Sequence, residues 1–346
     1  MTSLLHTPRS VLVTGGAGFI GSNFVAHVLA TDPTVRIVTL DALTYAGSLD
    51  NLRTELDNPR HTFVHGDITD ASLVRKVFTE EAIDTVLHFA AESHVDRSIT
   101  GPAAFIETNV VGTLTLLEAA RSAWERSGRW EPGVRFHHVS TDEVFGSLGM
   151  DDPPFSESSP YSPNSPYSAS KAASDHLVRA YHHTYGLPIT ITNCSNNYGP
   201  HQHPEKFIPT VIRSALSEKP IPIYGAGLNV RDWLYVTDHC VAIDRVVRAG
   251  NDGETYLVGG RSERRNIDIA RQICSLLDAR APQSSGSYLD LLTYVTDRLG
   301  HDFRYAIDSK HIESALGWRA AETFESGIEK TIDWYLANRA QLERAH

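Results

Sequence analysis

A tyrosine and a lysine four residues apart, Tyr167 and Lys171, have a spacing suited to proton transfer. If their segment is helical, the two side chains share one face about a turn apart. The neighbouring ammonium is expected to lower the pKa of the phenol, so that the pair supplies a base able to take a proton from a hydroxyl group. Because this spacing also arises by chance on solvated helices, the pair needs support from other residues.

The segment Ser140-Thr-Asp-Glu143, at the end of a predicted strand, provides that support. Ligands of open α/β sheets gather at the carboxyl ends of strands, where Thr141 is placed to hydrogen-bond a reacting hydroxyl. Hydride exchange alone needs no adjacent carboxylates, whereas removal of water from a sugar needs both an acid and a base, the roles open to Asp142 and Glu143. The alternative is a helix N-cap with favourable charges. Beside the tyrosine and lysine, the carboxylates favour catalysis of an elimination.

A glycine array lies near the N-terminus, in Val13-Thr-Gly-Gly-Ala-Gly-Phe-Ile-Gly21. Gly15, Gly18 and Gly21 follow a predicted strand and open a helical pattern, so they allow a tight turn and bring the backbone and a helix N-terminus close to a pyrophosphate. Asp41 closes the next strand about 20 residues later, where a carboxylate accepts hydrogen bonds from a ribose 2′-OH and repels a 2′-phosphate. The pattern predicts NAD rather than NADP.

The elements that must position these groups alternate along the first two hundred residues. Short β-branched runs alternate with segments of helical length, and this predicts an α/β fold with a Rossmann-type, doubly wound parallel sheet. The strands are expected at 11–13, 35–40, 62–65, 85–90, 135–140 and 189–192. The stretch 110–123, with Leu114, Leu117 and Ala120 on one face, suits a crossover helix that covers the sheet.

The composition changes twice further along the chain. Residues 150–166 are rich in Pro, Ser, Asp and Asn, which predicts a long surface loop. Beyond residue 200 the alternation fails and prolines punctuate short segments, as is typical of a smaller substrate-covering lobe. We therefore expect an NAD-binding domain over 1–200, with a return of roughly 232–261, and a C-terminal lobe over 201–346 that mostly binds substrate.

Composition limits the partners and the compartment. The 346 residues carry a net charge of −11, which argues against nucleic acid and requires a local basic pocket for any anionic substrate. The cysteines, Cys194, Cys240 and Cys274, are widely spaced, so neither a disulfide framework nor a metal site is indicated. No segment has the length or the leading apolar region for membrane insertion or secretion. A cytoplasmic location is expected.

Several further motifs extend the pattern along nearly the whole chain. They are Thr14-Gly-Gly-Ala-Gly-Phe-Ile-Gly21, Phe89-Ala-Ala-Glu-Ser-His-Val-Asp-Arg97, Ser140-Thr-Asp-Glu143, Ser165-Pro-Tyr-Ser-Ala-Ser-Lys171, Cys194-Ser-Asn-Asn-Tyr-Gly-Pro200, Pro204-Glu-Lys206 and Arg231-Asp-Trp233. With these motifs the sequence resembles the dTDP-glucose 4,6-dehydratases, members of the extended short-chain dehydrogenase/reductase superfamily. Together they are far more specific than the glycine array alone.

The resemblance implies a lyase that oxidises a nucleotide sugar at C4, removes water across C5 and C6 and returns hydride to C6, on one tightly bound NAD. It implies that Tyr167 is the base at C4, that Lys171 tunes it and binds the nicotinamide ribose, and that Thr141 holds the C4 oxygen. Glu143 would abstract the C5 proton and Asp142 would protonate the departing C6 hydroxyl. The expected substrate is dTDP-glucose and the expected product is dTDP-4-keto-6-deoxy-glucose.

The resemblance also implies two sets of binding residues. On the cofactor side these are Gly15, Gly18, Phe19, Ile20, Gly21, Asp41, Leu43, Thr44, Asp67, Ile68, Phe89, Ala90, Ala91, Ser93, Thr108, Tyr167, Lys171 and Asn197. On the substrate side they are Ser93, His94, Thr141, Asp142, Glu143, Asn196, Glu205, Lys206, Arg231, Asn266, Arg298 and His301. For Asp67 and Ile68, a simple cap at the strand end is an equal alternative. Family members pair through two long helices, which implies a homodimer.

Two features depart from the family pattern, and two other functions stay open. Leu299 stands where the family commonly has proline, and Phe303 where a basic residue is frequent, so both positions affect the expected binding of the diphosphate. His201 and His203, in a loop expected to face the substrate, could change the preference for the sugar or the nucleobase. A nucleotide-sugar 4-epimerase would share the cofactor and the tyrosine but has no use for the acid–base pair. A non-catalytic NAD-binding protein would lack one or more of the catalytic set. The nucleobase, and the pathway served, are left open by the spacing.

Overall fold

The computed structural model describes residues 5–297 and 301–343. Its body is a seven-stranded sheet in the order β12-β8-β7-β4-β1-β2-β3, and every pair of neighbours in it is parallel. The strands are β1 (Ser10–Thr14), β2 (Arg36–Asp41), β3 (His61–His65), β4 (Thr85–His88), β7 (Arg135–Thr141), β8 (Ile189–Cys194) and β12 (Thr255–Val258). The strand order reverses between β1 and β4, so the fold is the doubly wound α/β sheet expected from the sequence.

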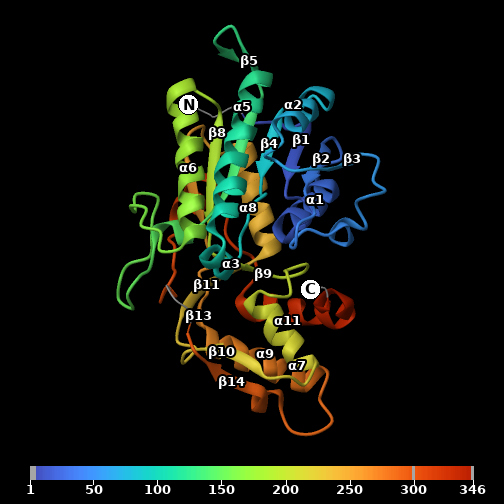
Figure 1. Ribbon diagram of the computed structural model, residues 1–346, viewed down its shortest axis with the longest axis vertical. Helices are drawn as coiled ribbons and strands as arrows, with labels where there is room; N and C mark the ends of the chain where they lie inside the picture. The colour runs from blue at the N-terminus through green and yellow to red at the C-terminus, as the bar shows by residue number, and fades with distance from the viewer. Residues whose placement is uncertain (1–4, 298–300, 344–346) are drawn as a thin grey trace.

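Helices cover both faces of this sheet (Figure 1). They are α1 (Phe19–Thr31), α2 (Ala71–Glu80), α5 (Thr113–Trp124), α6 (Pro166–Tyr185) and α8 (Val236–Ala249). Alternate strand residues point to opposite faces. Leu12 thus packs with α2, α5 and α6, whereas its neighbours Val11 and Val13 pack with α1 and α8. Burial on both faces explains why the strands read as continuous apolar runs.

A smaller lobe lies below the sheet body in Figure 1. Its helices α7 (Phe207–Leu216), α9 (Asn266–Arg280) and α11 (Phe324–Ala337) enclose a second apolar core with the parallel pair β10 (Ile221–Tyr224) and β14 (Leu292–Val295). A three-stranded sheet of β13 (Glu263–Arg265), β11 (Val230–Tyr235) and β9 (Asn196–Tyr198) joins the lobe to the body. The segment after β11 returns to the body as α8 and β12.

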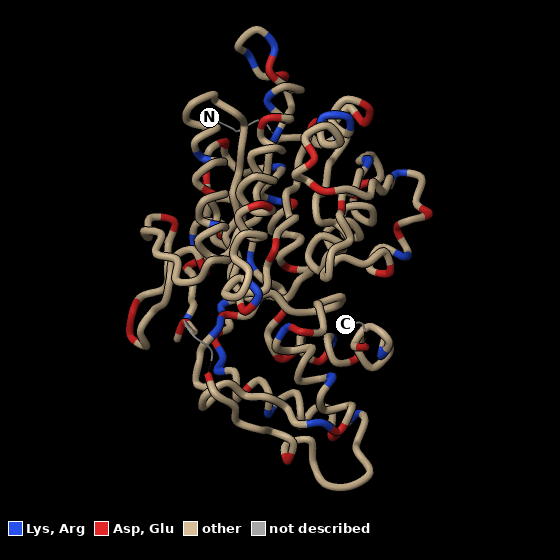
Figure 2. The backbone as a smooth tube through the Cα atoms, viewed as in Figure 1, with Lys and Arg blue, Asp and Glu red and all other residues tan. Residues whose placement is uncertain are grey.

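Shorter elements complete the chain. They are α3 (Val95–Thr100), α4 (Pro102–Phe105), α10 (Lys310–Leu316), the π-helical η2 (Ile106–Gly112), the 3₁₀ helices η1 (Leu49–Leu52), η3 (Asp142–Phe145), η4 (Tyr288–Leu291) and η5 (Arg339–Leu342), and the hairpin of β5 (Glu125–Arg126) and β6 (Arg129–Trp130). Acidic and basic positions are interspersed over the fold (Figure 2). Within the described ranges, no helix is long and apolar enough to cross a membrane.

The six strands expected from the sequence are all present, and residues 150–165 form an irregular loop as predicted. The helix expected over 110–123 differs in two ways. Its first turns are π-helical, and Leu114, expected on the covered face with Leu117 and Ala120, is 38% exposed. Leu117 and Ala120 are buried as expected, together with Leu116, so Leu114 lies at the edge of the buried stripe of α5.

Helix α6 carries the tyrosine and the lysine, and its ends are set by local sequence. Ser165 forms a capping box with Ser168, Pro166 occupies the first turn, where no N–H is required, and Gly186 ends the helix in the left-handed conformation at φ 74°. These signals place Tyr167 at the start of the helix, next to the carboxyl ends of β7 and β8.

Candidate active site

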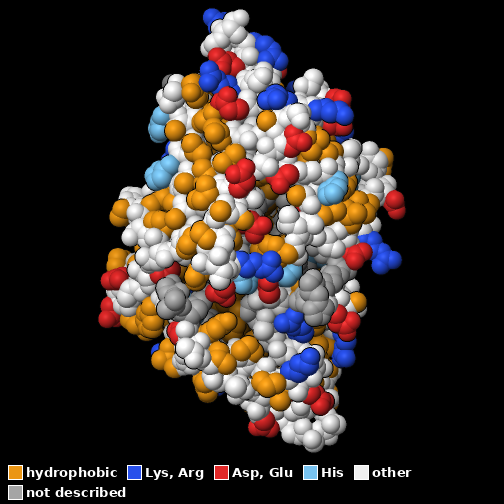
Figure 3. Space-filling model, in the orientation of Figure 1, with side chains coloured by type: hydrophobic (Ala, Val, Ile, Leu, Met, Phe, Trp, Pro, Cys, Tyr) orange, Lys and Arg blue, Asp and Glu red, His pale blue; other side chains and the backbone are white. Residues whose placement is uncertain are grey.

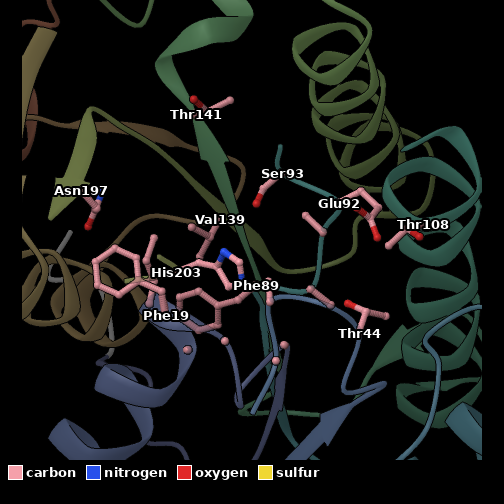
Figure 4. A pocket seen from close by; sticks show the side chains of 18 of the residues that line it. Phe19, Thr44, Phe89, Glu92, Ser93, Thr108, Val139, Thr141, Asn197 and His203 are labelled. Carbon is pink, nitrogen blue, oxygen red and sulfur yellow. The ribbon is translucent and has the colours of Figure 1, made fainter. Parts of the chain in front are cut away.

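One cavity, of about 320 Å³, opens at the carboxyl ends of β1, β4, β7 and β8. Figure 4 shows side chains from distant parts of the chain around it, among them Phe19 after β1, Phe89 after β4, Thr141 at the end of β7 and Asn197 after β8. Parallel strands bring their carboxyl ends to one edge of the sheet, so loops far apart in sequence converge there.

The glycine turn forms one wall of this cavity. A Cβ on Gly15, which has φ +70°, would lie 2.7 Å from the backbone N and Cα of Ala90, and a Cβ on Gly21 would lie 2.3 Å from the carbonyl oxygen of Gly15. Both glycines are therefore required for close packing of strand, turn and helix. Gly18 caps α1 without a side-chain hydrogen bond, and the first turn of α1 holds no acidic residue. The free N–H groups there suit a pyrophosphate.

Asp41 ends β2 beside this turn, and its carboxylate is already hydrogen-bonded to the backbone. Its carboxylate accepts hydrogen bonds from the backbone N–H groups of Ala17 at 2.9 Å and Leu43 at 2.8 Å. Burial raises its pKa, although these two hydrogen bonds oppose the shift. Two carboxylate oxygens have about four acceptor positions, so capacity remains for a ribose hydroxyl. Asp41 thus holds the turn in place and fits the sugar next to it.

The tyrosine and lysine line the cavity together, and both are buried. The Lys171 ammonium donates a hydrogen bond to the Val139 carbonyl at 2.9 Å. Burial and the nearby charge of Glu143 raise the pKa of Tyr167, against a lowering interaction with the Thr141 hydroxyl. The net shift of the Tyr167 pKa is thus upward, against the lowering expected from the sequence, because burial is its largest cause.

The acidic pair lies on η3, directly after β7. Thr141 is the N-cap of this short helix, and its hydroxyl accepts a hydrogen bond from the Glu143 backbone N–H at 3.2 Å. The capping role considered for the carboxylates thus belongs to the threonine. Asp142 is 1% exposed, and burial together with the charges of Glu143 and Asp232 raises its pKa well above the ordinary value. A carboxyl group in this environment keeps its proton and is suited to act as an acid.

Residues expected on the substrate side fall into two groups. Lys206 lines the cavity and donates to the Ser93 carbonyl at 2.9 Å, and Glu205 lies 3.7 Å from His94 and 3.3 Å from Arg97. Arg231 does not line the cavity but is 5% exposed, so it is not the solvated surface residue that a lone arginine often is. Its guanidinium lies 4.2 Å over the Tyr305 ring.

Other expected positions lie away from the cavity wall or outside the described residues. His94, Leu43, Asn266 and His301 do not line the cavity; His301 lies 2.6 Å from Asp297. Arg298 and the departure at Leu299 fall outside the described residues. Phe303, the second departure, is 40% exposed, and its main-chain carbonyl accepts a hydrogen bond from the Arg231 guanidinium at 3.3 Å.

The remaining expected residues all line the cavity. They are Gly15, Gly18, Phe19, Ile20, Gly21, Asp41, Thr44, Asp67, Ile68, Phe89, Ala90, Ala91, Ser93, Thr108, Thr141, Asp142, Glu143, Tyr167, Lys171, Asn196, Asn197, Glu205 and Lys206. Asp67 also accepts hydrogen bonds from Thr69, so it caps the strand end as well. His203, singled out from the sequence for sugar or base preference, also lines the cavity, as do Tyr45, Glu92, Val139, Ser195 and Gln202, which were not among the expected site residues. Across the described ranges, no group of three or more metal-ligating side chains is present.

Sheet, glycine turn and cavity define the chain as a Rossmann-type enzyme of the short-chain dehydrogenase/reductase class. The family model for GDP-mannose 4,6 dehydratase matches residues 12–331. A dTDP-glucose 4,6-dehydratase of Xanthomonas campestris is 58% identical over 334 residues, 96% of this chain and 94% of that protein. The chain therefore belongs to the dTDP-glucose 4,6-dehydratase family.

Solved structures agree with this assignment. A dTDP-glucose 4,6-dehydratase of Streptomyces venezuelae, with NAD bound, is 47% identical with a TM-score of 0.88, covering 97% of this chain and 100% of that chain. The corresponding enzyme of Bacillus anthracis, in complex with NAD, is 44% identical with a TM-score of 0.86, covering 98% of this chain and 100% of that chain.

Replacing the buried acid changes how stability depends on pH. The folded-state pKa of Asp142 is raised, so the native protein keeps a proton that the unfolded chain releases above pH 3.8, and stability falls as pH rises toward the folded pKa. Asp142→Asn has no such group. We expect the free energy of unfolding of Asp142→Asn, relative to that of the wild type, to increase by up to ~1.4 kcal/mol for each unit of rising pH across that window.

Urea unfolding from pH 4 to 8 measures this gain. The matched control is Asp57→Asn, at an exposed loop carboxylate, for which the difference from wild type should not change with pH. An Asp142→Asn difference that is constant across the range would contradict the raised pKa.

Proposed function

We propose that this protein is an NAD-dependent dTDP-glucose 4,6-dehydratase, a hydro-lyase that forms dTDP-4-keto-6-deoxy-glucose. The observation that carries the proposal is the meeting of two chemistries in one cavity: a tyrosine–lysine pair for proton transfer at a hydroxyl, and an Asp142–Glu143 pair for elimination. The high identity to dTDP-glucose 4,6-dehydratases over nearly the whole chain supports it. A 4-epimerase needs only the first pair.

Tyr167, Lys171 and Thr141 would act at sugar C4. When bound, NAD supplies a reversible acceptor of hydride from C4 and its donor to C6. Tyr167 would take the proton of the C4 hydroxyl, and Thr141, whose hydroxyl interacts with the phenol, would hold the same oxygen by a hydrogen bond. Lys171, fixed to the Val139 carbonyl, would stabilise the phenolate form of Tyr167 that accepts this proton.

Glu143 and Asp142 would carry the elimination. Glu143 is half-buried on the cavity wall and would remove the proton from C5, which becomes acidic once C4 is a ketone. The proton that leaves with the C6 hydroxyl comes from Asp142, whose raised pKa suits a donor at neutral pH. The two neighbouring carboxylates therefore divide the acid and base roles by their environments, buried for the acid and partly solvated for the base.

The cofactor and the nucleotide would occupy different parts of the chain. The glycine turn, the α1 N-terminus and Asp41 fit the NAD pyrophosphate and ribose, in the domain of residues 1–200 with the return of 232–261. The lobe of residues 201–346 would hold the nucleotide diphosphate, with Lys206, on the cavity wall, among its cations. Because the net charge is −11, these local cations matter for binding an anionic substrate.

The proposal predicts a specific isotope pattern. Wild-type protein incubated with dTDP-glucose in D₂O should release a 4-keto-6-deoxy sugar carrying deuterium at C5, without consumption of added NAD, because the C5 proton exchanges with solvent and the hydride does not. Nuclear magnetic resonance and mass spectrometry of the product measure this. Recovery of a C4 epimer with no deuterium would contradict the proposal.

A second prediction separates the two chemistries. Glu143→Gln removes the C5 base but leaves the tyrosine–lysine pair, so C5 exchange should fall by at least ~10²-fold while transient NADH absorbance persists. Stopped-flow absorbance and deuterium incorporation measure the two steps. Glu118→Gln, at an exposed carboxylate on α5, is the control and should exchange normally. Normal exchange in Glu143→Gln would remove this residue from the base role.

We also propose a homodimer and a cytoplasmic location. Apolar side chains remain exposed along η2 and α5, including Ile106, Val111 and Leu114, and Figure 3 shows hydrophobic side chains gathered over α5 and α6. Burial of such a stripe against a second copy would remove it from water.

The cysteines are buried and free, which agrees with a reducing compartment.

The dimer proposal predicts that Leu114→Glu yields a monomer, because a charge placed in an apolar interface is costly to bury. Light scattering after size-exclusion chromatography measures the mass. Leu56→Glu is a closely matched control, since Leu56 is also 38% exposed but lies in the loop after η1, and it should leave the mass unchanged. A Leu114→Glu protein that keeps the dimer mass would exclude this face as the interface.

A further inference from the structure

Asp175 is a fully buried carboxylate that none of the proposed catalytic steps uses. It lies on α6 one turn after Lys171, so the two side chains share a face of the helix. It does not line the cavity but lies behind the cavity wall, against β7 and β8. A buried charge is costly unless it is compensated, so its position calls for a physical reason.

Three side chains surround the carboxylate. The Tyr161 hydroxyl donates to Oδ2 at 2.7 Å, the Asn193 side-chain amide donates to the same oxygen at 3.1 Å, and His138 Nε2 lies 3.1 Å from Oδ1. Burial acts to raise the pKa of Asp175, but His138, Lys171 and Tyr161 outweigh it and lower the pKa to about 2. Asp175 is therefore an anion at neutral pH.

Its immediate neighbours do not neutralise this charge. Burial lowers the pKa of His138 to about 4, so the imidazole is neutral at pH 7, and the tyrosine and asparagine are neutral donors. Two cations lie on the same helix. Arg179 donates to the Tyr161 hydroxyl at 2.7 Å, with its guanidinium 4.9 Å from that ring, and so approaches the carboxylate only through the phenol. The other is Lys171.

Lys171 needs a counter-charge. The residue is 4% exposed and its ammonium is hydrogen-bonded to a neutral carbonyl; burial lowers its pKa, whereas Asp175 acts to raise it. In a dry interior, an opposite charge one helical turn away acts with little screening. The carboxylate thus offsets the loss of solvation that would otherwise favour a neutral amine.

The same carboxylate also holds the strand end that carries Thr141. The Asn193 amide that donates to Asp175 donates as well to the Thr141 main-chain carbonyl, at 3.0 Å. Asn193 is fully buried on β8. Through it, α6 and the end of β7 are locked in one arrangement, and Tyr161 adds the irregular loop that precedes α6.

We propose that Asp175 is a positioning residue for the hydride-transfer half of the reaction: it keeps the Lys171 ammonium protonated and, through Asn193, fixes Thr141 against α6. The inference rests on the proposed function, because it assigns Asp175 its effect through Lys171 and Thr141.

The other titratable groups that face Lys171 do not replace this charge. From β4 and β7, His88 and His138 have lowered pKa values because they are buried, and from β8, Cys194 has a pKa raised by burial to about 12. On the cavity side lie Tyr167, whose pKa is raised, and the carboxyl groups of η3. Removal of the Asp175 charge should therefore let the amine lose its proton at lower pH.

The test is the pH profile of kcat/KM for dTDP-glucose between pH 6 and 10 in Asp175→Asn. We expect the basic limb to move down by about one pH unit, which is about a tenfold loss of activity at high pH, with a much smaller loss at pH 6.5. Asp175→Glu should restore the limb. Tyr161→Phe removes a hydrogen bond from the same carboxylate but keeps its charge, so its limb should stay at the wild-type position even if the protein is less stable.

A uniform loss of activity in Asp175→Asn with an unmoved limb would overturn the proposal, as would an equal shift in Tyr161→Phe. If the Asn variant does not fold, Asp175→Gln and Asp175→Glu give the same comparison at equal side-chain length. A measurement that needs no turnover is the pH titration of ε-¹³C-labelled lysine by nuclear magnetic resonance. The Lys171 signal is assigned by its absence in Lys171→Arg. The titration midpoint of Lys171 should move to lower pH in Asp175→Asn. Turnover of dTDP-glucose by the wild-type protein is measured in parallel. Absence of wild-type turnover would contradict the proposed function, whereas the lysine titration would still test the role of Asp175.

Discussion

The removal of ionisable groups from water at the carboxyl edge of the parallel sheet is the constraint on which the site depends. Burial raises the pKa of Asp142 and of Tyr167 and lowers that of Lys171. In each case the neutral form is favoured, because a low-dielectric interior penalises charge. Asp142 thereby retains the proton that the proposed elimination requires. A lysine in the same environment keeps its charge only with an anion nearby, and Asp175 occupies that position.

This arrangement requires the sheet to be covered on both faces. Helices α2, α5 and α6 cover one face and α1 and α8 the other, so the strand ends are the places where polar groups reach a cavity. Gly15, Gly21 and Ala90 pack so closely that the wall of the cavity has little freedom to move. Lys206, at the N-terminus of the lobe helix α7, also lines the cavity and donates a hydrogen bond to the Ser93 carbonyl on the same wall.

Several residues serve the fold and the proposed chemistry at once. Thr141 caps η3 while its hydroxyl faces the cavity, and Asp41 binds two backbone N–H groups of the turn while retaining acceptor capacity for a ribose. Such double use explains why a structural role and a functional role are not exclusive at these positions. It also means that substitutions there disturb stability and activity together, whereas Glu143, half-buried on the wall, offers a cleaner separation.

The sequence by itself determined the parallel sheet, six of its strands, the glycine turn and most of the residues around one edge, because short β-branched runs, glycines and short motifs act locally. It also pointed to the family through its motifs. It did not determine the exposure of Leu114, which lies at the edge of the buried stripe of α5, or the direction in which the pKa of Tyr167 moves. Only the tertiary structure brought His138, Tyr161 and Asn193 onto Asp175. Solvation and contacts between separate elements decide such properties, and both are set by packing rather than by neighbouring residues.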